Sequence, residues 1–400
     1  MKYVILIGDG MGDRPCPELG GKTPLEAAYT PHLDRLASQG MLGLAKTIPE
    51  GMTPGSDVAN MSILGYDPRL HLSGRAPLEA ASLGVRLAEN EIAFRLNLVH
   101  LIFESGGRVV MGDHSAGNIT SEEGRVLVAD LADRLPLHEG QKLYPGVSYR
   151  HLLTWPGIDA DLPTIAPHDH RDQDVTDYLS QTGPIRPILD LIRSSWPILE
   201  DHPINRARKS AGLRTANAIW PWGQGRPLVL KTYAELYGLQ GAVISAVDLI
   251  RGLGVYAGLE PLVVPGATGF LDTNYEGKVG AALKNLKRVD LALIHVEAPD
   301  EASHQGSLEE KILAIEQFDG RVVGPVCQGL ARFAPARLLI LCDHYTLLTT
   351  KTHSGEPVPF IIHPHPEPSG RAYSEAEAGR TGVLVDPGHA LIRLLLNQGA

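Results

Sequence analysis

The 400-residue sequence has few cysteines, no long apolar run and no block of basic residues. Its three cysteines, Cys16, Cys327 and Cys342, form no CxxC pair and no regular spacing, which indicates reduced thiols in a cytoplasm. No run approaches the roughly 18 apolar residues that a membrane span needs. With 36 Lys and Arg against 46 Asp and Glu, the formal net charge is −10. This charge and the lack of a basic block argue against a nucleic-acid partner.

Three further patterns are missing. We find no internal repeat and no low-complexity tract. The apolar stretch at the N-terminus is too short for a signal peptide. The glycines Gly8, Gly10 and Gly12 are followed by Asp13 where a dinucleotide fingerprint would have its third glycine, so a nucleotide cofactor is disfavoured here.

The length of the chain favours two domains. Compact apolar runs that alternate with helical patterns predict an α/β core with a mainly parallel sheet flanked by helices, over residues 1–71 and 201–400. Residues 72–200 have a different sequence pattern, with segments in which apolar and polar residues alternate, such as Ile92–Leu98, and with many turns. We therefore predict a smaller α/β domain, 72–200, inserted into the core. Within the core, the pattern predicts a helix over Thr30–Gly40, one long helix over Leu308–Leu330 and a strand over Val358–His363.

Acidic and histidine side chains follow three of the predicted core strands. Tyr3–Ile7 is followed by Asp9, Leu291–Val296 by Asp300 and His304, and Leu338–Leu341 by Asp343, His344 and His353. Ligands of open α/β sheets gather at the carboxyl ends of the strands, so these side chains are placed for chemistry. Carboxylates and imidazoles without thiolates suit Mn²⁺, Zn²⁺ or Mg²⁺. With Ser56 they make seven ligands, which are too many for one ion with an open position and indicate two ions.

Ser56 follows a Pro-Gly turn and precedes the predicted helix Val58–Leu64. One interpretation is an ordinary N-cap serine, a residue type that helix starts prefer. The other is a nucleophile, with the free N–H groups of the helix start holding its phosphoryl group and a metal activating its hydroxyl.

The predicted insert and its border offer polar groups for an anionic ligand. His168 and Asp169 lie in the segment PHDH, and Arg206, Arg208 and Lys209 lie in HPINRARK. A guanidinium fork matches carboxylate and phosphate oxygens, so the basic residues are candidate substrate-binding groups. A solvated helix face is the alternative interpretation of each.

Long motifs throughout the chain resemble one known family. The segments GDGMGD, PEGMTPGSDVANMSILGYD, PGATGFLDTNYEGK and HVEAPDEASH, together with the DH…TH pair, resemble the archaeal-type cofactor-independent (2,3-bisphosphoglycerate-independent) phosphoglycerate mutases of the alkaline phosphatase superfamily. The resemblance implies an isomerase of glycolysis and gluconeogenesis that interconverts 3-phosphoglycerate and 2-phosphoglycerate, with an alkaline-phosphatase-like core and an inserted lid.

The resemblance also implies site residues and cofactors. Ser56 would be transiently phosphorylated, and no bisphosphoglycerate cofactor would be needed. Two Mn²⁺ ions are implied, with Zn²⁺, Mg²⁺ or Co²⁺ as alternatives. One ion would take Asp9, Ser56, Asp343 and His344, and the other Asp300, His304 and His353. Apart from the resemblance, we predict that His168 and Asp169 manage protons on the two hydroxyls of the substrate. The partner is a small phosphorylated substrate, and the oligomeric state stays open between monomer and homo-oligomer.

The sequence departs from the family at two places. Tyr345-Thr346-Leu347 stands where the family usually has Pro-Thr-Pro, and His170 stands where it favours Ile. Segments such as GRAPLEAASLGV resemble a bacterial branch that has been proposed to contain homoserine kinases. Two alternative functions therefore remain open. One is a homoserine kinase that uses ATP, and the other is a metal-dependent phosphatase of the same superfamily.

Overall fold

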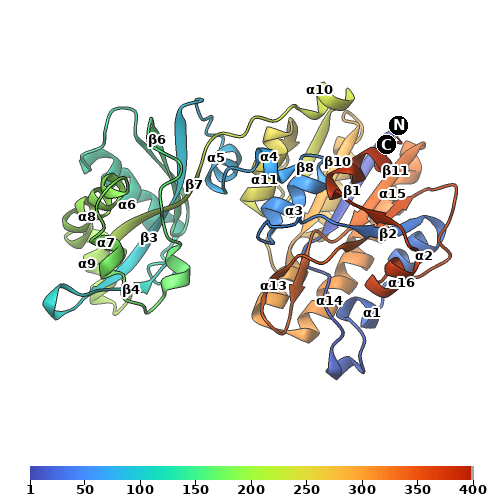
Figure 1. The fold of residues 1–400 in the computed structure, drawn as a ribbon, viewed down its shortest axis with the longest axis horizontal. Helices are drawn as coiled ribbons and strands as arrows, with labels where there is room; N and C mark the ends of the chain where they lie inside the picture. Colours follow the sequence, from blue (N-terminus) through green and yellow to red (C-terminus); the bar gives the residue numbers. More distant parts are fainter. Residues whose placement is uncertain (398–400) are drawn as a thin grey trace. The chain divides into compact units, whose positions relative to one another are not determined.

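The computed structural model describes residues 1–397, which form two compact units (Figure 1). The first unit contains Met1–Leu72 and the chain from Val229 onward, and the second contains Ser73–Leu228. The second unit therefore ends at Leu228 instead of at residue 200, where the sequence analysis placed its end. The physical reason is strand β7 (Ala218–Gly225), which pairs with β3 (Glu91–Phe103) in the sheet of the second unit.

The first unit is built on an eight-stranded sheet with the order β15-β2-β14-β11-β1-β10-β8-β9. Its strands are β1 (Lys2–Gly8), β2 (Met41–Ala45), β8 (Gly241–Ile244), β9 (Leu259–Pro261), β10 (Leu291–Val296), β11 (Ala336–Leu341), β14 (Val358–His363) and β15 (Leu384–Val385). A separate small hairpin joins β12 (Tyr345–Leu347) to β13 (Thr352–Ser354).

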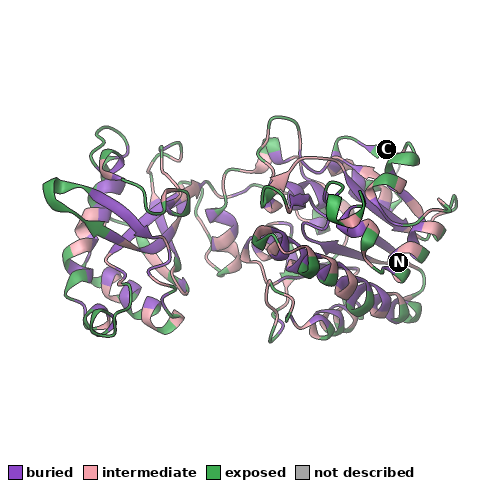
Figure 2. Cartoon of the chain, turned by 90° about the horizontal axis from the view of Figure 1, so that it is seen from below, coloured by how far each residue is buried: buried purple, intermediate pink, exposed green. Residues whose placement is uncertain are grey.

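The centre of this sheet is parallel, as the sequence predicted. Strand β1 pairs in parallel with β10 on one side and with β11 on the other, and β8 pairs in parallel with β10. All six residues of β10 are buried, and the strands inside this unit are coloured as buried in Figure 2. Apolar side chains on both faces of a strand are typical of a parallel sheet that helices cover on each side. The predicted strand Val358–His363 is confirmed as β14, which runs antiparallel to β11.

Helices lie on both faces of the sheet in Figure 1. They are α1 (Pro24–Ala27), α2 (Pro31–Gln39), α3 (Ser56–Ile63), α4 (Pro68–His71), α10 (Tyr233–Tyr237), α11 (Asp248–Tyr256), α12 (Tyr275–Asn285), α13 (Ala298–Gln305), α14 (Leu308–Phe318), α15 (Gly324–Leu330), α16 (Glu375–Arg380) and α17 (Leu391–Leu396). Helix α3 contacts α11, whereas α12 contacts α15.

The predicted helix over Leu308–Leu330 is interrupted. Between α14 and α15, residues Asp319–Val323 form a π-helical segment. Asp319 is buried there and accepts hydrogen bonds from the backbone N–H groups of His32 (3.2 Å) and Leu33 (2.7 Å) at the start of α2. A carboxylate from another helix therefore caps α2, whose own N-cap residue Thr30 makes no side-chain cap.

The second unit is an antiparallel sheet covered by helices. Its strands are β3, β4 (Val109–Asp113), β5 (Lys142–Val147), β6 (Arg150–Pro156) and β7, and its helices are α5 (Ala76–Ser82), α6 (Ser121–Arg134), α7 (Thr176–Leu179), α8 (Arg186–Glu200) and α9 (Pro203–Ser210). Its core includes Phe94, Leu96 and Trp220, each fully buried. None of the described helices, in either unit, has both the length and the apolar character that crossing a bilayer requires.

Candidate functional site

The parallel strands of the first unit end at a common edge. Gly8 of β1 pairs with Val296 of β10, and Ile7 pairs with Leu341 of β11, so the segments that follow these strands emerge side by side. These segments carry Asp9, Asp300 and Asp343, and all three carboxylates are at most 6% exposed. The edge of the sheet therefore gathers the acidic residues that the strand pattern singled out.

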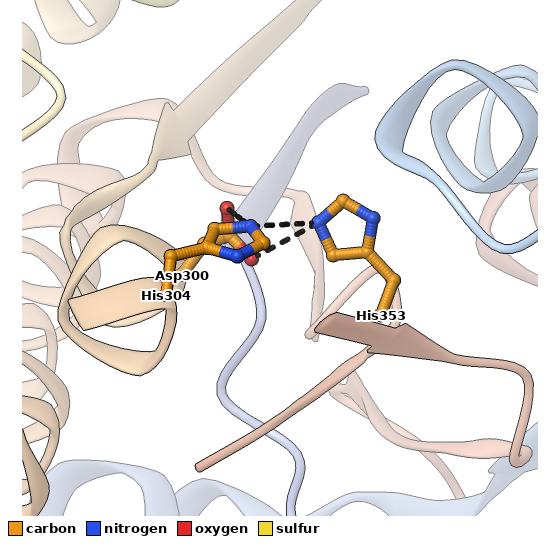
Figure 3. Close-up of side chains that lie close together, drawn as sticks. All are labelled: Asp300, His304 and His353. Atoms are coloured by element: carbon orange, nitrogen blue, oxygen red, sulfur yellow. Dashed lines mark hydrogen bonds and ion pairs between the residues drawn. The ribbon is translucent and has the colours of Figure 1, made fainter. Parts of the chain in front are cut away.

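One group consists of Asp300, His304 and His353 (Figure 3). Asp300 and His304 lie one turn apart on α13, and His353 comes from the hairpin strand β13. His304 Nε2 lies 3.2 Å from Asp300 Oδ2 and 3.0 Å from His353 Nε2. His304 Nδ1 donates to the carbonyl oxygen of Lys351 at 2.9 Å, so Nε2 is the nitrogen directed into the group.

The protonation of this group is strongly perturbed. Hydrogen bonding to Asp300 raises the pKa of His304 to about 9. Burial acts to raise the pKa of Asp300, but the hydrogen bonds from His304 and His353 outweigh burial and hold it well below its ordinary value. Without a metal ion, a proton on the imidazoles therefore supplies the positive charge that the buried carboxylate needs.

A second group surrounds Asp9. Its Oδ1 lies 3.5 Å from His344 Nε2, and Asp9, Asp300 and His344 offer ligand atoms that all lie within 4.8 Å of one another. Burial, followed by the carboxylates of Asp343 and Asp300, raises the pKa of Asp9 well above its ordinary value. Several buried carboxylates repel one another unless a cation or protons neutralise them.

Ser56 lies beside this second group. It is the first residue of α3, and its Oγ is 3.1 Å from His344 Nε2. The predicted position of its hydroxyl at a helix N-terminus is thus confirmed. Asn60, one turn further on α3, donates to the carbonyl oxygen of Ser56 (2.9 Å) and to Asp343 Oδ2 (2.8 Å). The helix start and the carboxylate are therefore held in one hydrogen-bonded unit.

The structure brings all seven predicted ligands to one edge of one unit. The donor set fits divalent cations, because it consists of carboxylates, imidazoles and one hydroxyl whose atoms converge. Asp9 Oδ1 is buried and has no hydrogen-bond partner among the described residues, which is expected of an oxygen meant for an ion. That these residues bind metal stays a prediction.

Sequence reasoning missed three polar residues at the site. Thr346 Oγ1 donates to Asp300 Oδ1 at 2.5 Å, Asn60 supports Ser56, and His295 Nε2 lies 3.1 Å from Asp9 Oδ2. Asn60 could have been found from its spacing of one helical turn from Ser56. Burial lowers the pKa of His295 to about 4, so its imidazole is neutral.

The candidate residues of the second unit do not gather in the same way. His168 and Asp169 lie in a short 3₁₀ turn, Pro167–His170, with His168 Nε2 at 3.5 Å from Asp169 Oδ1. Arg206 and Lys209, on α9, line a different cavity of about 630 Å³ that neither His168 nor Asp169 lines.

Arg208 is a structural residue. It is 5% exposed, and its guanidinium donates to Glu123 Oε2 (2.7 Å) and to the carbonyl oxygens of Ala116 and Arg214 (both 2.9 Å). These contacts occupy the donors that a ligand would need. Arg208 is therefore not placed to bind substrate as the sequence predicted, because its buried guanidinium is already paired with Glu123.

Three comparisons place the chain among known proteins. Residues 37–205 match the family model described as 2,3-bisphosphoglycerate-independent phosphoglycerate mutase. A probable enzyme of that name from Geobacter sulfurreducens is 48% identical and covers 100% of both chains, and one from Methanothrix thermoacetophila is 50% identical over 99% of this chain and 100% of that protein.

Two solved structures share the fold. A Pyrococcus horikoshii protein, PH0037, superposes with a TM-score of 0.82 at 28% identity and covers 99% of this chain and 97% of its own. The cofactor-independent phosphoglycerate mutase of Thermoplasma acidophilum superposes with a TM-score of 0.66 at 24% identity over 100% of each chain. At that identity the second likeness supports the fold alone.

Proposed function

The chain belongs to the 2,3-bisphosphoglycerate-independent phosphoglycerate mutase family, and we propose on this premise that it interconverts 3-phosphoglycerate and 2-phosphoglycerate through a phosphoserine at Ser56. It is an isomerase that moves a phosphoryl group within its substrate. We further propose that this reaction serves glycolysis and gluconeogenesis in the cytoplasm, in keeping with three free cysteines among the described residues.

One observation carries the proposal. The Ser56 hydroxyl lies at the N-terminus of α3 and against His344, inside the cluster of buried carboxylates and imidazoles. Gly55, and not Ser56, is the N-cap residue of α3, and no side chain caps this helix, so the interpretation of Ser56 as an ordinary N-cap serine is wrong. In the cluster, Asp9, Asp343 and His344 would hold one divalent ion with Ser56, and Asp300, His304 and His353 would hold a second. When bound, such ions lower the pKa of a coordinated hydroxyl and neutralise phosphoryl oxygens.

The protein groups then act in order. Ser56 Oγ attacks the phosphorus of 3-phosphoglycerate, the bond from phosphorus to the 3-oxygen breaks, and the proton that the serine hydroxyl loses ends on the 3-oxygen of the glycerate. The positive end of α3 faces the phosphoryl group on Ser56. Asn60 holds the start of α3 against Asp343 throughout. The glycerate then turns, and its 2-oxygen attacks the phosphorus of the phosphoserine. The bond from phosphorus to Ser56 Oγ breaks, and the proton of the 2-hydroxyl ends on Ser56 Oγ, which regenerates the serine. Because Ser56 carries the phosphoryl group between the two transfers, the reaction needs no bisphosphoglycerate cofactor.

We propose that the second unit, with the boundary at Leu228, acts as the lid that retains glycerate during this exchange. His168 and Asp169 are its candidate groups for proton transfer at the two hydroxyls, since both side chains are about half or more exposed. Arg206 and Lys209 remain candidate anion-binding groups, because both line a cavity.

The matched relatives are named mutases, which favours the isomerase over a homoserine kinase or a phosphatase. The test compares the purified protein with Mn²⁺ in three assays: formation of 2-phosphoglycerate from 3-phosphoglycerate, phosphorylation of homoserine by ATP, and release of inorganic phosphate. Only the first should proceed rapidly. Phosphorylated homoserine as the main product would overturn the proposal.

Ser56→Ala should abolish isomerisation and the incorporation of labelled phosphate into the protein. Ser62 offers a matched control on the same helix, because it is buried and its hydroxyl has no hydrogen-bond partner among the described residues. Ser62→Ala should keep both activities. Normal turnover in Ser56→Ala would exclude the phosphoserine.

A further inference from the structure

Lys311 is a buried lysine that neither the family resemblance nor the proposed reaction uses. It lies on α14, whose other buried residues include Ala314 and Phe318, and its exposed fraction is 0%. A buried ammonium is costly unless it is paired with an opposite charge and its protons are hydrogen-bonded. The partners of Lys311 therefore decide what its charge contributes.

The Lys311 ammonium has three acceptors, one for each of its protons. Its Nζ donates to Asp13 Oδ2 at 2.8 Å and to the carbonyl oxygens of Gly12 (3.1 Å) and Thr346 (2.7 Å). Gly12 and Asp13 lie on the segment after β1, which also carries Asp9, and Thr346 is the middle residue of β12. Lys311 therefore connects the segment after β1 to the hairpin of β12 and β13.

The same acceptors also receive backbone N–H groups of the hairpin and its turn. The Gly12 carbonyl accepts from the N–H of Thr346 at 3.2 Å, and Asp13 Oδ2 accepts from the N–H of Leu348 at 3.2 Å. Each of these oxygens is thus shared between Lys311 and the hairpin. Loss of the ammonium would remove the positive charge at the centre of this network and leave the Asp13 carboxylate buried without its partner.

The side chain of Thr346 faces the metal-binding group shown in Figure 3. Its Oγ1 donates to Asp300 Oδ1 at 2.5 Å, and Thr346 lies directly opposite His353 in the hairpin. His353 Nε2 is 3.5 Å from the same oxygen of Asp300. Thr346 therefore meets Lys311 with its backbone and Asp300 with its side chain, so a displaced β12 would move His353 away from Asp300.

The segment that carries Asp9 has further support. The N–H of Asp9 donates to the carbonyl oxygen of Val296 at 2.9 Å, and the N–H of Gly10 donates to Asp343 Oδ1 at 3.1 Å. Neither contact involves Lys311. Loss of Lys311 should therefore disturb the position of the hairpin more than the position of Asp9.

We propose that Lys311 is a positioning residue, whose ammonium holds the hairpin so that His353 meets Asp300 and thereby sets the affinity of the ion position that these two residues share with His304. The inference rests on the proposed function for the presence of the two ions. Lys311 itself binds neither ion nor substrate. It acts through Thr346, because the loss of a contact that orients a metal ligand typically weakens metal binding by about 10- to 100-fold.

The test measures the two ions separately. Metal-free full-length protein is dialysed against rising free Mn²⁺, and bound metal per chain is measured by mass spectrometry. In Lys311→Met, one of the two ions should bind about 10- to 100-fold more weakly and the other should change little. Anomalous diffraction at limiting Mn²⁺ should show that the weakened ion is the one beside His353. Unchanged affinities, equal weakening of both ions, or loss of the other ion would overturn the proposal.

A second variant separates positioning from stability. Lys311→Met leaves the Asp13 carboxylate without its partner, and the double variant Lys311→Met/Asp13→Asn removes that charge. Urea unfolding should show that the double variant regains stability, whereas the ion beside His353 should stay weak, because the carbonyl oxygens of Gly12 and Thr346 still lack the ammonium. Recovery of the affinity together with stability would assign Lys311 to the fold alone. If Lys311→Met fails to fold, the double variant carries the metal titration.

Asp319→Asn is the matched control. Asp319 is a buried charge directly after α14, and its hydrogen bonds go to the backbone of α2 instead of to the hairpin. This variant should lose stability without separating the two affinities, and a selective loss of the ion beside His353 would contradict the proposal. Selective loss in Lys311→Met, when wild type does not isomerise 3-phosphoglycerate, would overturn only the proposed function. Isomerisation by wild type with both ions equally weakened in Lys311→Met would overturn this inference alone.

Discussion

The Asn60 carboxamide donates a 2.8 Å hydrogen bond to Asp343 Oδ2, which ties the helix that begins at Ser56 to the carboxylate at the end of β11. Both residues are almost fully buried. The nucleophile and a metal-binding carboxylate are thus positioned relative to each other by one side chain.

We expect Asn60→Ala to weaken metal binding by about 10- to 100-fold, because it frees Asp343 Oδ2 from the donor that orients it. Metal titration of the metal-free protein measures the effect. The matched control is Asn285→Ala. The Asn285 carboxamide donates to the backbone carbonyl of Ala281, four residues earlier, at 2.8 Å, as Asn60 does to Ser56, but it donates to no carboxylate. Equal metal affinities in the two variants would refute the positioning role.

Metal removal should abolish isomerisation, and Mn²⁺ should restore it. His353→Ala should empty only the position of Asp300 and His304, because His353 belongs to that group alone. Asp9→Ala should leave that ion in place and weaken the binding of the ion near His344. Anomalous diffraction on each variant distinguishes the positions, and loss of the same ion in both would contradict the division.

Two arginines on one helix should behave in opposite ways. Arg208→Met should lower the free energy of unfolding by about 3 kcal/mol, because it strands the carboxylate of Glu123 and two carbonyl oxygens. Arg206→Met should change it by less than about 0.5 kcal/mol, since Arg206 is exposed. Urea unfolding measures both. A stable Arg208→Met protein would show that the buried contacts contribute little.

Asp169→Asn should affect the fate of the phosphoryl group more than its capture. If the second unit retains glycerate and manages its protons, this variant should still phosphorylate Ser56 but release more of the label as inorganic phosphate. Radiolabelled 3-phosphoglycerate, followed into 2-phosphoglycerate, protein and free phosphate, gives the partition. Proportional loss of phosphoserine and isomerisation, without added hydrolysis, would assign Asp169 to substrate capture.

Glu375 should make stability depend on pH. Burial raises its pKa from 4.5 to about 7, although the backbone N–H of Asp13 and the hydroxyl of Thr23 donate to it. The folded protein therefore binds one proton more than the unfolded chain between these two values, and stability falls as pH rises from 4.5 to about 7. We expect a loss of about 1–3 kcal/mol across this interval.

Glu375→Gln should remove most of this slope, because its amide does not titrate. Urea unfolding of metal-free protein at pH 5 and pH 8 gives the comparison, with Glu377→Gln, on the same helix and paired with Arg371, as the control. An unchanged slope in Glu375→Gln would assign the pH dependence to other groups.

The sequence alone allowed prediction of those site residues whose positions follow from local sequence patterns. Parallel strands bring their carboxyl ends to one edge, so Asp9, Asp300 and Asp343 could be grouped without a structure. His295 could not be grouped with them, because it stands inside the apolar run LALIHV, where a buried ring looks like any other core residue.

Long-range pairing explains the other misses. The end of the second unit depends on β7 pairing with β3, and the role of Arg208 depends on Glu123, 85 residues earlier. The π-helical segment Asp319–Val323 was hidden because apolar residues continue at steps of three and four through it. Asp319, at the start of this segment, caps α2, a contact between two elements that the sequence pattern does not reveal.

The hairpin of β12 and β13 restricts how the length of this chain can vary. Thr346 and His353 are directly opposite each other, so both side chains lie on the same face of the hairpin and both approach Asp300. Successive residues of a strand alternate between faces, so one residue inserted or deleted within β13, between Thr352 and His353, would turn the imidazole away. Surface loops such as Ser105–Gly107 are exposed and should accept insertions, tags or a break in the chain. Circular permutation or library design should therefore leave residues 343–354 at constant length.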